Sequence, residues 1–234
     1  MQTSEGSIQE NKMIIQPIPV LPIIPINPFF RVMCNTAPDV LVNVLATVVF
    51  IGIAVFLGWK FTQVLLKRSY KSNLVVNLVL SGVVALALFL RFGMSVAILQ
   101  GLYLYFILLF ASWSDITSHE VPDWVWLCLL PIAIMSIPTV SVASMVAAVF
   151  VLLIPQLAVS ILPPHKPLGG ADTKLTVCMA MVLGFSRGIG AYLVGLLAAV
   201  IFMSIYNKVK NRSSREAFAL IPFLAGAAFT AFLI

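Results

Sequence analysis

Long apolar runs, separated by short basic or proline-containing segments, fill the sequence from about residue 40 to its end. A helix that crosses a bilayer needs about 20 mainly apolar residues, and eight runs approach or exceed this length. They cover residues 40–66, 74–91, 95–113, 121–138, 140–162, 173–186, 188–206 and 217–234. The pattern predicts an all-α, polytopic membrane protein with about eight transmembrane helices, or seven if residues 173–206 form a single span.

Charged residues are scarce and are mostly basic. They make up 9% of the 234 residues, with a formal net charge of +6, whereas a soluble domain carries about 25%. The basic residues lie between apolar runs and not in a polar domain, which excludes a nucleic-acid binder and makes the lipid bilayer the expected surroundings. Three widely spaced cysteines, Cys34, Cys128 and Cys178, form no CxxC pair and argue against a structural zinc site or a disulfide framework.

The basic clusters orient the chain. They fall within residues 67–71, after the first apolar run, and within 207–216, before the last one. Under the positive-inside rule both loops are cytoplasmic. Counting spans then places residues 114–120 and 163–172 on the same face, and it requires two crossings within 173–206, joined by a tight outer turn.

The chain divides into three parts. Residues 1–38 form a polar tail and a proline-rich apolar arm, in which the prolines between residues 19 and 28 recur every third residue, as in a polyproline II helix. Residues 39–94 are two N-terminal transmembrane helices. Residues 95–234 form a membrane domain that carries the motifs described next.

Two aspartates stand at ends of apolar runs. Asp115 follows one run, and Asp172 lies behind two glycines in Leu168-Gly169-Gly170-Ala171-Asp172-Thr173-Lys174. Ionisable groups at membrane depth mark functional sites, and the topology above brings both to one face, which suggests acid–base chemistry. The alternatives are structural: Asp115 caps the next helix, and Asp172 is a helix N-cap behind a glycine loop.

Asp115 together with Gly169-Gly170-Ala171-Asp172-Thr173-Lys174 resembles the type IV prepilin peptidases, including the preflagellin and tight-adherence-type relatives. Members of that family carry an aspartate at the end of one span, an Ile-Pro-Asn-like helix start and a GxGD motif, usually followed by x-Lys. Val121-Pro122-Asp123 is similar to the second element, and Ile221-Pro222-Phe223-Leu224-Ala225 to the proline-containing last span. The resemblance covers residues 95–234. Ala171 replaces the glycine before the aspartate, so the loop must tolerate a methyl group there.

The resemblance implies a membrane aspartic endopeptidase that removes the short basic leader from type IV prepilin-like substrates at the cytoplasmic face of the cell (inner) membrane. Asp115 and Asp172 are the implied catalytic pair, which shares one proton across a bound water. The implied substrate-binding residues are Gly169, Gly170, Ala171 and Lys174; Lys174 either steadies Asp172 or marks the inner boundary. No metal or other cofactor is required, and the zinc-cysteine methyltransferase domain of bifunctional relatives looks absent.

Two other functions fit parts of the pattern. A presenilin-like GxGD intramembrane peptidase ranks lower because the chain has no Pro-Ala-Leu segment of the kind those proteins carry. A non-enzymatic transporter or scaffold would use the two aspartates to bind a cation or a proton. His119 and His165 are expected to be loop residues outside the chemistry. Neither the oligomeric state nor the individual pilin substrate follows from the sequence.

Overall fold

The computed structural model describes residues 37–70, 72–161, 170–210 and 218–234. All regular structure in these ranges is α-helical, which confirms the predicted fold class. The seven helices are α2 (Ala37–Lys67), α3 (Leu74–Phe92), α4 (Val96–Ser118), α5 (Trp124–Ser136), α6 (Val142–Ile161), α7 (Gly170–Lys210) and α8 (Ile221–Leu233). Five of them, all except α5 and α8, contain segments long and apolar enough to cross a membrane. The predicted proline-rich arm lies outside the described residues, apart from its last two.

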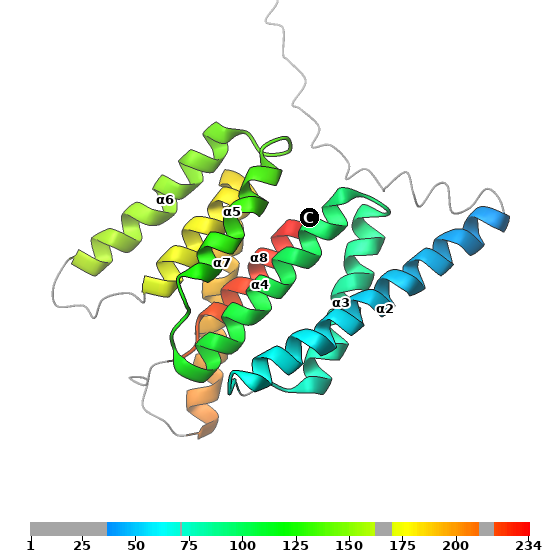
Figure 1. The fold of residues 1–234 in the computed structure, drawn as a ribbon. Coiled ribbons are helices and arrows are strands. Elements are labelled where there is room, and N and C mark those ends of the chain that lie inside the picture. The colour runs from blue at the N-terminus through cyan, green and yellow to red at the C-terminus, as the bar shows by residue number, and fades with distance from the viewer. Residues whose placement is uncertain (1–36, 71, 162–169, 211–217) are drawn as a thin grey trace, which may run out of the picture.

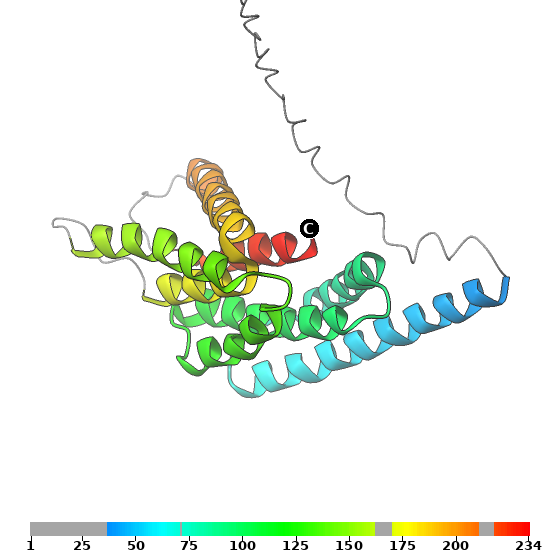
Figure 2. The same ribbon diagram turned by 90° about the horizontal axis from the view of Figure 1, so that it is seen from above.

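The helices pack around α4, α7 and α8 (Figures 1 and 2). α8 contacts both α4 and α7, α5 packs beside α7 and α4, and α6 covers another side of α7. The α2–α3 hairpin packs against α4 on the other side of the molecule. The largest buried apolar cluster is built chiefly by α4, α5, α7 and α8, so these four helices form the core that holds the site.

Helix α7 reverses direction at Gly184, where the backbone leaves helical geometry with φ 75° and ψ −171°. Two contacts establish the reversal. A Cβ on Gly188 would lie 3.3 Å from the Cα of Ala180, and Thr176 lines the same small cavity as Tyr192. Residues eight apart in a straight helix are about 12 Å from each other. The two arms of α7 are therefore antiparallel, as the two-span interpretation of 173–206 requires.

Several predicted boundaries were wrong. The spans predicted over 121–138 and 217–234 are helices of 13 residues each, α5 and α8. At 1.5 Å per residue each is about 20 Å long, shorter than the roughly 30 Å hydrocarbon core. α5 ends at Ser136 and is followed by a turn over residues 137–139, which contains Pro138. In contrast, α4 extends to Ser118 and α7 begins at Gly170, so Asp115 and Asp172 both lie in terminal helical turns.

Helix ends that are distant in sequence meet at two ends of the bundle. At one end, the carboxylate of Asp115 near the end of α4 accepts a hydrogen bond from the first residue of α8, and the start of α7 forms an ion pair with the residue before α5. At the other end, Arg91 of α3 donates hydrogen bonds to the backbone carbonyls of Leu233 and Ile234. The helix ends that carry the two aspartates therefore lie at the same end of the bundle, as predicted.

Candidate functional site

Asp115 lies in the last turn of α4 and is 7% exposed. Its carboxylate Oδ2 accepts a hydrogen bond of 3.0 Å from the backbone N–H of Ile221, and the Leu220 backbone also interacts with it. Leu220, the N-cap residue of α8, supplies no side-chain acceptor. Since the first N–H groups of a helix lack partners within the helix, Asp115 caps α8 from another helix. The structural alternative, in which Asp115 is a helix cap, is thus partly correct. The capped helix, however, is α8 and not α5, the next one along the chain.

This cap leads to a prediction about two substitutions at one position. Asp115→Ala removes the acceptor and leaves the buried Ile221 N–H unsatisfied, so the free energy of unfolding should fall by about 1–3 kcal/mol. Asp115→Asn keeps an acceptor oxygen, so its free energy of unfolding should fall by clearly less. Thermal unfolding of the two variants in the same detergent measures the difference. Equal stability of the alanine and asparagine variants would show that the hydrogen bond to Ile221 contributes nothing.

Asp172 lies in the first turn of α7 and is half-buried. It is close enough to Asp115 for the two carboxylates to interact electrostatically. Tyr192, from the second arm of α7, is likewise within electrostatic range of Asp172. His119 follows the last turn of α4 in a left-handed conformation and is within range of Asp115. The fold thus brings together two carboxylates that are far apart in sequence.

The implied substrate-binding residues lie around Asp172, except Gly169, which falls outside the described residues. Gly170 is exposed, and a Cβ added to it would meet nothing within 4 Å. Ala171 is partly buried and packs against the main core, so the methyl group at this motif position is accommodated by the protein. The backbone carbonyl of Asp172 accepts a hydrogen bond of 2.8 Å from the Thr176 hydroxyl, which fixes the first turn of α7.

Lys174 pairs with Asp123 and not with Asp172. The Lys174 ammonium donates to the Asp123 carboxylate, and their side chains are 50% and 79% exposed. This ion pair connects the Val121-Pro122-Asp123 element with the Gly-Gly-Ala-Asp element. The turn between α4 and Val121 is held by the hydroxyls of Ser114 and Ser118, which donate to the backbone carbonyl of Glu120 at 2.6 and 3.1 Å.

Sequence reasoning missed three features of this site: the cap on Ile221, the proximity of Tyr192 and the Asp123–Lys174 pair. Opposite charges on two loops of one face were a usable signal for the ion pair. The proximity of Tyr192 to Asp172 depends on how the two arms of α7 align, and this alignment depends on where the helix reverses. Within the described ranges, no cluster of three or more His, Cys, Asp or Glu side chains has the geometry of a metal site.

Two carboxylates within electrostatic range of each other can act as an acid–base pair. When such a pair carries a single proton, one member can accept a proton while the other donates one. Among the described residues, nothing lies within 4 Å of a Cβ added to Gly170, so a peptide could approach on this side.

Comparison with known proteins identifies this region. Residues 102–206 match the type IV leader peptidase family. The matched segment contains Asp115, Asp172 and the Asp123–Lys174 pair, and it ends before α8. No curated protein and no solved structure shows significant similarity to the chain.

Proposed function

We propose, from the membership of residues 102–206 in the type IV leader peptidase family, that the chain is an aspartic endopeptidase that removes the short basic leader of prepilin-like proteins. The observation that carries this proposal is the placement of Asp115 and Asp172 within electrostatic range of each other. Both lie in the matched segment, and the folding of α4 to α7 brings them together. If the only role of Asp115 were to cap α8, a second carboxylate near it would not be needed.

In the proposed reaction the two carboxylates share one proton and hold a water molecule. The ionised carboxylate takes a proton from the water, and the water oxygen at the same time forms a bond to the scissile carbonyl carbon. The protonated carboxyl group donates to the carbonyl oxygen. Collapse of the tetrahedral intermediate breaks the C–N bond, and the leaving amine takes up a proton. The proton belongs to the pair, so neither residue is assigned permanently as base or acid.

The local contacts suggest how the pair is oriented. The N–H of Ile221 holds the Asp115 carboxylate at the start of α8, and the packed first turn of α7 holds Asp172. Charged groups that are held in place before the reaction need little reorganisation during it, which is a large source of catalytic acceleration. Asp115 thus serves as both cap and catalytic residue in this proposal.

The direct test is cleavage of a defined reporter. The purified protein is reconstituted in liposomes with a prepilin-like protein that carries a basic leader, a glycine before the cut and an apolar segment after it. Mass spectrometry of the product should show one new N-terminus directly after that glycine. Absence of any cleavage by the folded, inserted protein would favour the transporter or scaffold alternative.

The proposed cytoplasmic location rests on the basic residues of the loops at the aspartate end. Single cysteines, introduced into a background without the three native ones, should be shielded there from an impermeant reagent added outside intact cells. Cysteines at the opposite end should react. Exposed positions for the test are Lys67 and Glu120 at the aspartate end, and Met94 and Arg187 at the opposite end. The reverse labelling pattern would place the site outside the cytoplasm.

A further inference from the structure

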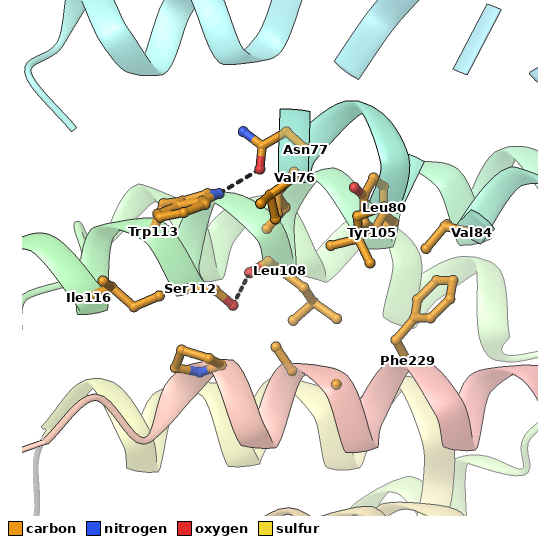
Figure 3. Close-up of a pocket in the computed structure, with 14 residues that line it drawn as sticks. Val76, Asn77, Leu80, Val84, Tyr105, Leu108, Ser112, Trp113, Ile116 and Phe229 are labelled. Carbon is orange, nitrogen blue, oxygen red and sulfur yellow. Dashed lines mark hydrogen bonds between the residues drawn. The ribbon is translucent and has the colours of Figure 1, made fainter. Parts of the chain in front are cut away.

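A groove lies along one side of the bundle, and one of its lining residues, Ile116, is next to Asp115 in the chain. Its volume is about 350 Å³, and it lies between α3, α4 and α8. Figure 3 shows α3 on one side, α8 on the other and side chains of α4 between them. The α4 residues that line it extend from Tyr105 to Ile116, a length of about 16 Å at 1.5 Å per residue.

Neither aspartate lines the groove, but one end of it is formed by residues next to the Asp115–Ile221 hydrogen bond. Ile116, which follows Asp115 in the chain, lines one end of it. Pro222 lines the same end and follows Ile221, whose N–H is bonded to the Asp115 carboxylate. A peptide held at Asp115 for cleavage would therefore lie close to this end of the groove.

The surface of the groove is apolar because its polar groups already have partners. Trp113 Nε1 donates to Asn77 Oδ1 at 2.8 Å, the Ser112 hydroxyl donates to a backbone carbonyl of α4 at 2.7 Å, and Tyr105 is bonded to Ser81 at 3.1 Å. None of the lining residues carries a formal charge. A polar or charged occupant would be desolvated without compensation, so the groove favours an apolar one.

Helix α3 forms the third wall and lies outside the matched segment 102–206. It is tied to the neighbouring helices by buried bonds: Asn77, which accepts from Trp113 of α4, also donates to Thr62 of α2 at 3.0 Å. Val76 and Leu80 are 49% and 40% exposed, so the groove opens at its side along α3. The α2–α3 hairpin thus supplies a rigid wall whose rim is accessible from the bilayer.

We propose that this groove receives the apolar segment that follows the scissile bond in the substrate, and that the side chains of α3 determine which segments fit. The inference rests on the proposed peptidase function, because that function places the substrate backbone at Asp115. It assigns a substrate-selecting role to Val76 and Leu80. It also explains why the hairpin is bonded to α4 only two residues before the aspartate.

Gly226 offers a way to fill the groove without disturbing the protein. It lines the groove on α8, and a Cβ added to it would meet nothing within 4 Å. Gly226→Leu should therefore place a side chain in the space that the substrate needs. Gly52→Leu on α2 is the matched control: it makes the same change in an exposed helix, also with nothing within 4 Å, but away from the groove. The gain in helix propensity is the same for both.

Two substrates distinguish an effect on binding in the groove from an effect on the cleavage reaction. One is the membrane-inserted reporter with its apolar segment; the other is a short peptide that ends a few residues beyond the cut. Gly226→Leu should raise KM for the reporter by about tenfold, equivalent to about 1.4 kcal/mol of binding, and by clearly less for the short peptide. Gly52→Leu should leave both values unchanged. Equal losses on the two substrates, or no loss on either, would overturn the proposal.

A cross-linking experiment keeps this inference separate from the proposed function. p-Benzoylphenylalanine replaces Val76 in the inactive Asp172→Asn variant, which is then irradiated with the reporter present. Capture of the reporter through its apolar segment supports the proposal, even if the wild-type protein cuts nothing. Capture of lipid alone, or of a second copy of this chain, assigns the groove to that occupant and overturns it. If the wild-type protein cuts the reporter and no capture occurs, the function stands and the groove proposal fails.

Discussion

Asp172→Asn is expected to abolish cleavage of the prepilin-like reporter while the protein still inserts and accumulates. Asparagine has the shape of aspartate but cannot take a proton from water. The Thr176 hydroxyl bonds to the backbone carbonyl of residue 172, so the first turn of α7 keeps this contact in the variant. Loss of one member of a catalytic pair should lower kcat by a factor on the order of 10⁴ or more. Single-turnover cleavage at matched protein levels provides the measurement.

Asp115→Asn should give the same loss, and the double variant should be no worse than either single one. Groups that act as a unit show this non-additivity. Asp123→Asn is the control, because it removes a third carboxylate from the same end of the bundle. The Asp123–Lys174 pair is exposed, and exposed pairs contribute about 0–1 kcal/mol, so this variant should retain most of its activity. Near-normal cleavage by Asp172→Asn would reject the catalytic pair.

The meeting of Asp115 and Asp172 could be predicted from the sequence because it depends on topology alone. An even number of crossings between two loops places both on one face, and the apolar runs 121–138 and 140–162 supply two crossings between the aspartates. The positions of the aspartates within the helices could not be predicted as well. Hydropathy locates apolar runs, but the end of α4 depends on turn contacts such as the bonds from Ser114 and Ser118 to the Glu120 carbonyl.

The contacts around the pair could not be predicted because they depend on three-dimensional packing. Nothing near Asp115 in sequence indicates that its partner is the N–H of Ile221. The contacts of Asn77 could not be predicted either. In the sequence it is a polar residue in an apolar run, and in the structure it forms hydrogen bonds with both α2 and α4. The predicted outer turn within 173–206 has glycines at 184, 188 and 190, and hydropathy does not choose among them. The choice is made by α5 and α6, whose connecting segment and first turn pack against Gly184.

Gly184→Ala is therefore expected to be strongly destabilising. The combination of φ 75° and ψ −171° belongs to a region that is essentially restricted to glycine and costs about 1–3 kcal/mol for other residues. An added Cβ would also lie 2.5 Å from Val140 Cγ1 and 3.0 Å from Ser144 Oγ. Relief of that overlap should cost about 1–3 kcal/mol more. The Ser144 hydroxyl cannot simply move away, because it accepts a hydrogen bond of 2.8 Å from the Phe185 N–H at the start of the second arm.

Gly190→Ala is the matched control for this prediction. Gly190 lies on the same helix with nothing within 4 Å of its added Cβ, so alanine should be neutral or stabilise the helix by about 0.5–1 kcal/mol. Unfolding in detergent and accumulation in the membrane measure both variants. Gly184→Ala should also lose cleavage in the fraction that remains folded, because the reversal places Tyr192 of one arm beside Asp172 of the other. Equal stability of the two variants would mean that α7 does not need its reversal at residue 184, and the position of Asp172 beside Asp115 would then need another cause.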